Sequence, residues 1–242
     1  MSTVTRQRAA IMTGLRTFLR ERTNLMLLVV LPPIVLLAFD ISLGTIGDAP
    51  GIEVPAAAAE LGGALFATAF LAGLLGVFQV VGGTEPDRRL AVCGYRPWEI
   101  LSARLLTIVA ASALVATLVY ATFRWLSDIT PRAPVLVIGA LLVAAVTYGL
   151  IGVIIGSLVG RELEGSLILV FLADFDAFAA LGVIPMDSGI IDYVPLAHPH
   201  AMLESAVHDG TVATGDLVVA GTYVVVLAVI ALVAVTIRGE TI

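Results

Sequence analysis

The sequence of 242 residues contains no lysine and only one cysteine, Cys93. A lone cysteine excludes an internal disulfide and any metal cluster that cysteines alone would hold. All thirteen basic residues are therefore arginine, and the formal net charge is −6. This bias is typical of a GC-rich genome and carries no information about mechanism.

Several nucleotide-binding and catalytic motifs are also absent. The chain contains no GxxxxGK[ST] phosphate loop, no HExxH, no GxSxG and no pairing of cysteine with histidine. Without the phosphate loop it does not bind ATP in that way, and the other patterns would hold zinc or present a nucleophile. We therefore expect no enzymatic activity, no catalytic residue, and no metal or cofactor bound by this chain itself.

Charged residues are scarce, and this scarcity sets the class of the protein. Only 13% of residues are charged and 59% are hydrophobic, with a mean hydropathy of +1.04. These values lie far from the soluble average. At about 20 apolar residues per crossing helix, six crossings and their loops fit the length. Long continuous apolar runs are unlike the short alternating strands of a membrane β-barrel. The predicted fold class is an all-α, multi-pass membrane protein with six transmembrane helices in a single domain, 1–242.

The apolar runs divide the chain into six expected spans. Two prolines, Pro32 and Pro33, should kink the first span. Small residues that let helices approach closely recur in the second and fourth spans. In the fourth span, Gly152, Gly156 and Gly160 are spaced four apart and should form one packing ridge. The spans cover about Leu25–Ser42, Glu60–Val81, Ile100–Arg124, Val135–Val159, Ser166–Ile184 and Asp216–Ile237, and the other small residues are Gly62, Gly63, Gly73, Gly76 and Gly149.

The arginines predict how the chain is oriented in the membrane. Eleven of the thirteen fall in segments that would share one side, and only Arg124 and Arg132 fall on the other. Because basic residues collect on the cytoplasmic side, both termini are expected inside the cell. Segment 4–22 should be an amphipathic helix at that surface, with Arg6, Arg16 and Arg20 on its polar face.

The segment 82–99, GGTEPDRRLAVCGYRPWE, is the longest polar, arginine-bearing stretch between two apolar blocks. Its basic residues place it on the cytoplasmic side. There it would offer a charged surface to a soluble partner. The long segment 185–215 is too polar to cross and should contain one or two short helices at the outer face.

Two acidic residues lie near the middle of the fifth expected span, Asp174 and Asp176. Intramembrane carboxylates are costly and usually face a bundle interior, a pore or a charged partner. Two residues apart on a helix, they point to nearly opposite sides and cannot form one paired site. One of them is a candidate pathway residue while the other meets an arginine or a neighbouring helix. The alternative is that the span begins later and both lie near the outer surface.

A second candidate is the set His200, Glu204 and His208, spaced four apart on an expected outer helix. Such spacing aligns two imidazoles and a carboxylate for a metal. The two histidines are two turns apart, which is long for one ion, so the favoured interpretation is the solvated face of a surface helix.

The order of these features resembles the membrane subunits of type 2 ABC transporters, the exporter permeases. The resemblance covers essentially the whole chain, and its individual motifs are loose. The arginine-rich helix precedes the first span, and the second span is followed by Glu85, Arg88-Arg89-Leu90, Gly94 and Pro97. Later come Ile100-Leu101, Arg104-Leu105, Pro185, Val194-Pro195-Leu196 and His198-Pro199.

The resemblance implies a permease that acts as a dimer, with a second permease copy and two cytoplasmic ATPase subunits, in the lipid bilayer of the cell membrane. ATP and magnesium would be bound by the ATPase, and no nucleic acid would be involved. The segment that couples to the ATPase would consist of Glu85, Pro86, Asp87, Arg88, Arg89 and Leu90. An ion-coupled secondary transporter or channel that uses Asp174 or Asp176 is the main alternative, and a membrane anchor that moves nothing is a third.

Overall fold

The computed structural model of the chain describes residues 22–47, 56–83, 97–184 and 188–240. All regular structure within these ranges is helical, so the predicted all-α class is confirmed for them. Each of the six expected spans coincides with a long helix, and two short helices lie between the last two. The helices are α2 (Arg22–Gly47), α3 (Ala56–Gly82), α5 (Pro97–Leu126), α6 (Pro134–Val159), α7 (Glu162–Ala180), α8 (Ser188–Ile191), α9 (Ala197–His208) and α10 (Thr214–Glu240).

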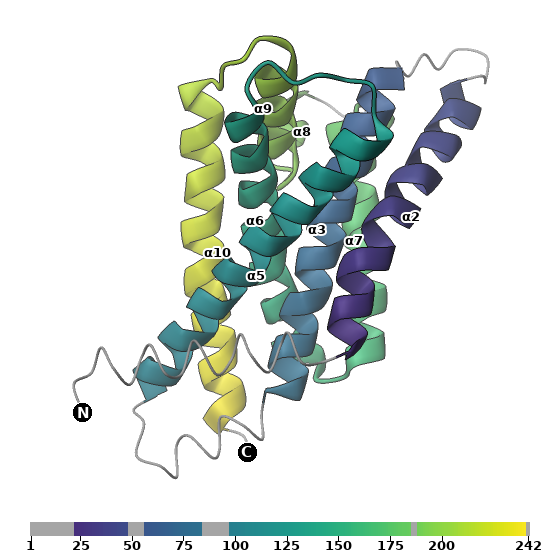
Figure 1. The fold of residues 1–242 in the computed structure, drawn as a ribbon. Coiled ribbons are helices and arrows are strands. Elements are labelled where there is room, and N and C mark those ends of the chain that lie inside the picture. Colours follow the sequence, from purple (N-terminus) through teal and green to yellow (C-terminus); the bar gives the residue numbers. More distant parts are fainter. Residues whose placement is uncertain (1–21, 48–55, 84–96, 185–187, 241–242) are drawn as a thin grey trace.

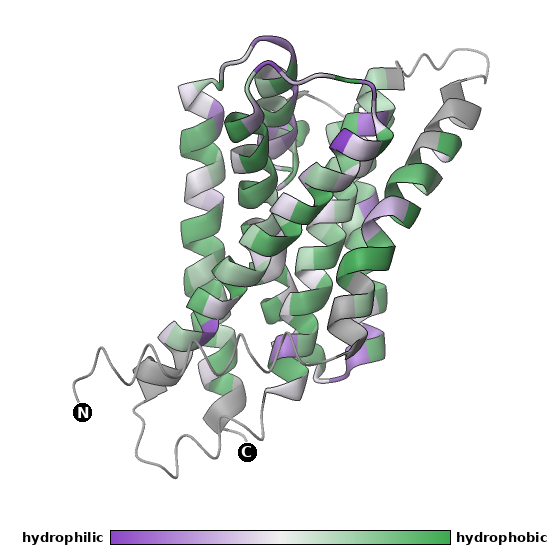
Figure 2. Ribbon diagram, in the orientation of Figure 1, coloured by the Kyte–Doolittle hydropathy of each residue, from purple (hydrophilic) through white to green (hydrophobic). Residues whose placement is uncertain are grey.

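Four of these helices, α3, α5, α6 and α10, are long and apolar enough to cross a membrane. Helix α2 adds a shorter apolar stretch, Leu28–Phe39, and it continues through Pro32 and Pro33. Helix α7 carries four acidic residues within its 19 positions. Figure 2 shows the apolar character running along the long helices. The described chain therefore has the helices of a multi-pass membrane protein.

Successive long helices alternate in direction, and α3 and α6 occupy the middle of the bundle (Figure 1). Helix α3 packs on α2, α5, α6 and α7, while α6 also packs on α9 and α10. Helices α8 and α9 lie at one end of the bundle, beside the start of α10 (Figure 1). We call this end the α9 end, and we call the opposite end, where α6 turns into α7, the Gly160 end.

Glycines allow the two central helices to approach until their backbones touch. A Cβ added at Gly152 of α6 would overlap the carbonyl oxygen of Gly73 in α3. A Cβ at Gly76 would likewise overlap the carbonyl oxygen of Gly149, and one at Gly156 would lie 3.0 Å from that of Val77. The predicted packing ridge is therefore confirmed for the two glycines of α6 at positions 152 and 156.

The prediction that Gly160 belongs to this ridge is wrong. Gly160 ends α6 in the left-handed conformation, with φ of 73°, and its N–H donates to the carbonyl of Gly156 at 3.1 Å. Glycine is favoured there because a side chain would be strained at positive φ. Its role is to turn the chain toward α7.

The turn at the Gly160 end is shorter than the sequence predicted. Helix α7 begins at Glu162 rather than near Ser166. Acidic residues are favourable in the first turn of a helix because of the positive end of its dipole, and Glu162 and Glu164 occupy that turn. Arg161 precedes them, exposed, with its guanidinium 2.6 Å from the Glu164 carboxylate.

The second span's other glycines also mark close contacts, as predicted. A Cβ at Gly62 would meet the side chain of Leu181, just after α7, and one at Gly63 would meet Phe39 of α2. Phe39 also stacks between Phe66 and Phe178, with ring centroids 5.2 and 5.5 Å away. These contacts hold α2, α3 and α7 together.

Candidate functional site

Two of the predicted functional segments lie outside the described residues. They are the amphipathic helix with Arg6, Arg16 and Arg20, and the coupling segment from Glu85 to Leu90. The structure therefore bears on the acidic pair of α7 and on the segment between α7 and α10.

Asp176 lies in the interior of the bundle, where it is 2% exposed. One carboxylate oxygen accepts a hydrogen bond from the hydroxyl of Tyr148 in α6, at 2.5 Å. The other accepts from the backbone N–H of Leu196, at 3.3 Å. Of the two expected partners, an arginine or a neighbouring helix, Asp176 has the second, because it meets Tyr148 of α6 and the backbone amide of Leu196.

The contact with Leu196 places a carboxylate at the start of α9. Leu196 is the residue immediately before the first helical turn. The first N–H groups of a helix have no partner within it, and the helix dipole makes that end electropositive. Asp176 therefore stabilises the beginning of α9 and joins it to α7 and, through Tyr148, to α6.

Asp174 lies two residues earlier on the same helix and is only half-buried. This difference agrees with the predicted placement of the two carboxylates on opposite sides of the helix. Asp176 lies four residues before the end of α7 at Ala180, which puts it toward the α9 end. The alternative in which this span begins later is not supported, because α7 begins earlier than expected, at Glu162.

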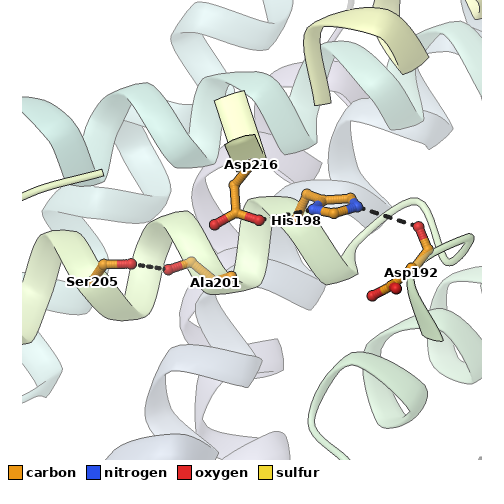
Figure 3. Close-up of polar contacts among 5 residues, drawn as sticks. All are labelled: Asp192, His198, Ala201, Ser205 and Asp216. Atoms are coloured by element: carbon orange, nitrogen blue, oxygen red, sulfur yellow. Dashed lines mark hydrogen bonds and ion pairs between the residues drawn. The ribbon is translucent and has the colours of Figure 1, made fainter. Parts of the chain in front are cut away.

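His198, in the first turn of α9, forms a second connection at this end (Figure 3). Its Nδ1 lies 2.9 Å from a carboxylate oxygen of Asp216 in α10. Its Nε2 lies 3.2 Å from the backbone carbonyl oxygen of Asp192, just after α8. The side chains of His198 and Asp216 are largely buried, at 15% and 25% exposed. We call the pair formed by His198 and Asp216, with the Asp192 carbonyl, the His198 clamp.

The far end of α9 is held by backbone hydrogen bonds. The N–H groups of Arg132 and Ala133, just before α6, donate to the carbonyls of Val207 and Ala206 at 3.1 and 3.2 Å. These bonds satisfy carbonyls that the end of a helix would otherwise leave unpaired. Between the two ends, α9 buries Pro199, Met202, Leu203, Ala206 and Val207.

The three residues predicted as a metal alignment have different surroundings. Glu204 and His208 are exposed. The Nε2 of His200 is buried and has no hydrogen-bond partner among the described residues. Burial lowers the pKa of His200, and the nearby Glu204 carboxylate offsets this only in part. Within the described ranges, no group of three potential ligands is close enough to hold a metal.

A small hollow lies between α5, α6 and α10, toward the Gly160 end. It has room for about one water molecule, whereas ligand pockets usually exceed about 300 Å³. It is therefore no cargo site within one copy of the chain. Its lining consists of Arg104, Leu105, Ile108, Val153, Ala231, Leu232 and Val235.

Tyr148, Leu196 and the His198–Asp216 pair did not emerge from the sequence as functional residues. The one available signal was Tyr148, a phenol hydroxyl inside a glycine-rich helix whose other polar side chains are only Thr147 and Ser157. Such a hydroxyl usually finds a partner when buried.

No protein-family model matches the chain, and no curated protein matches it either.

Proposed function

We propose that this chain is the membrane subunit of an ATP-driven exporter of the ABC type, with ATP hydrolysis on a separate cytoplasmic subunit. The observation that carries this proposal is the order of the helices. Two short helices, α8 and α9, are inserted between the last two of six long helices and lie together at one end of the bundle. The resemblance found in the sequence implies the same order.

In this proposal all six long helices cross the membrane and both termini are cytoplasmic. The Gly160 end would be the inner end, since the segments that the sequence assigns to that side carry most of the arginines. Helix α3 ends at this inner end, and segment 84–96 follows it in the sequence. It would dock on the ATPase through Glu85, Pro86, Asp87, Arg88, Arg89 and Leu90.

The α9 end would then be the outer end, with α9 as the cap over the exit. The contacts of Asp176 and of the His198 clamp support this assignment, because they attach α9 to three different long helices. A second copy of the chain would complete the pathway. ATP binding and hydrolysis would shift the pair between inward-open and outward-open populations.

An ion-coupled transporter remains the second candidate, with Asp174 or Asp176 as the ion relay. Both carboxylate oxygens of Asp176 already accept hydrogen bonds from the protein. That arrangement favours an anchoring role for Asp176. Within this second candidate, the half-buried Asp174 is the more accessible of the two carboxylates.

Charge reversal in the coupling segment tests the exporter proposal. The double substitution Arg88→Glu and Arg89→Glu is expected to abolish transport-linked stimulation of the ATPase, because it replaces the cations at the proposed docking surface with anions. The measurement is the ATPase rate of the reconstituted complex with and without the variant permease.

Arg161→Glu is the matched control, since Arg161 is exposed at the Gly160 end but lies outside the coupling segment. It should leave the stimulation near that of the unmodified chain. If the double variant folds normally and still stimulates the ATPase as the unmodified chain does, the assignment of the coupling segment is wrong.

A further inference from the structure

The ring of His198 lies between two oxygen acceptors. One is the carboxylate of Asp216 and the other is the backbone carbonyl of Asp192. Neither oxygen can donate a hydrogen bond, and a neutral imidazole has only one N–H. Only the protonated ring can therefore donate at both nitrogens, and only the protonated ring also attracts the Asp216 carboxylate.

We propose that the attachment of α9 to the bundle is a proton-responsive latch, closed most firmly when His198 is protonated. In that state the first turn of α9 is joined to α10 through Asp216 and to the chain after α8 through Asp192. When the ring is neutral, one of the two hydrogen bonds and the ionic attraction are lost. Protonation of His198, taken by itself, therefore tightens the attachment of α9, and its deprotonation loosens it.

The two ends of α9 differ in what holds them, and this difference sets the direction of opening. The far end is joined to Arg132 and Ala133 by backbone bonds that do not titrate in this range. The first turn is held by the His198 clamp and by the hydrogen bond that the N–H of Leu196 donates to the Asp176 carboxylate. Loosening should thus begin at the first turn, with the Val207 end acting as the hinge.

Other titratable groups lie near α9, and the protonation of some of them loosens α9, whereas protonation of His198 tightens it. His200 is buried on the same helix and its pKa is lowered by that burial. Acid therefore favours an undocked α9, in which His200 can be protonated. Protonation of Asp176 would weaken the hydrogen bond that its carboxylate accepts from the N–H of Leu196. The groups near α9 include Asp192 and Tyr193 after α8, Asp216 and Tyr223 of α10, Asp176 of α7, Tyr148 of α6, and His200 and Glu204 of α9 itself.

Because these contributions have both signs, the pH dependence of the unmodified chain alone cannot isolate the clamp. The variant His198→Gln can, because glutamine still offers a donor and does not change charge between about pH 5 and pH 8. It leaves every other titrating group in place. The ratio between the unmodified chain and this variant therefore reports on His198 alone.

The test is hydrogen exchange of the purified full chain in lipid nanodiscs, at about pH 5.5 and about pH 8. Protection factors of α9 amides, corrected for the intrinsic rate at each pH, measure its local opening. At the lower pH the unmodified chain should be protected about tenfold more than His198→Gln, as expected for a charge-assisted hydrogen bond. At the higher pH the two should agree within about threefold. The central turns of α6 serve as the internal reference.

A ratio that does not change between the two pH values would overturn the latch. Asp216→Asn is the second variant, because it keeps the shape of the acceptor but removes its charge. It should also reduce the pH dependence, and a full dependence in this variant would contradict the proposal even if His198→Gln failed to fold. The experiment needs no ATPase and no cargo, so its outcome is separate from that of the exporter proposal.

Discussion

Replacing Gly152 with alanine is expected to destabilise the bundle by about 3 kcal/mol, the upper part of the usual range for overpacking. The added Cβ would overlap the backbone carbonyl of Gly73, and a backbone atom cannot move aside as a flexible side chain can. The two central helices would have to separate. The measurement is thermal unfolding in detergent, followed by far-ultraviolet circular dichroism.

Gly139→Ala in the same helix is the matched control. A Cβ at Gly139 has no described atom within 4 Å, so this substitution should be neutral or stabilise the helix by about 0.5–1 kcal/mol. Equal unfolding temperatures for the two variants would show that α3 and α6 do not touch through their backbones at Gly152.

Asp176→Ala should be the second large effect. It leaves the N–H of Leu196 without its acceptor, and it leaves the buried hydroxyl of Tyr148 with only the backbone carbonyl of Leu172, at 3.4 Å. Each buried group that loses its partner costs about 1–3 kcal/mol. The loss of stability should be about 2–4 kcal/mol. It should be accompanied by faster hydrogen exchange at the start of α9. Asp176→Asn, which keeps one oxygen acceptor, should lose less.

Asp174→Ala is the control for this substitution, since Asp174 is on the same helix but only half-buried. It should change the unfolding temperature little. If Asp176→Ala instead unfolds like the unmodified chain but loses transport, Asp176 is a pathway residue and not an anchor for α9.

The sequence was sufficient to place the helices because the apolar runs are long and separated by polar or proline-containing segments. The first residue of α7 was harder to predict from the sequence. The expected spans end at Val159 and begin again at Ser166, which leaves Glu162 and Glu164 between them, although acidic residues also favour the first turn of a helix. Gly160 was assigned to the packing ridge on its spacing alone, and the same residue type serves equally well to end a helix.

The candidate site was only partly predictable for a different reason. Helical periodicity separated Asp176 from Asp174, because direction around a helix follows from spacing. The partners of Asp176 and of His198 depend on which helices meet at the α9 end, and no local pattern contains that information. Tyr148 and Asp176 are 28 residues apart, and His198 and Asp216 are 18 apart.

The same limit applies to the histidines of α9. Their spacing suggested a shared metal site, whereas the bundle buries His200 and leaves His208 exposed. The histidine with the better-defined contacts is His198, which is not one of the three residues of the metal alignment. Its partners lie on α10 and after α8, and they follow from the packing of α9.

The most direct test of the exporter proposal is gentle purification of the tagged chain from its own membranes, with identification of the soluble proteins that co-purify in stoichiometric amounts. The proposal predicts an ATPase that carries a GxxxxGK[ST] phosphate loop. A reproducibly solitary chain, stable and dimeric, would contradict it and would favour an ion-coupled transporter that uses Asp174 or Asp176.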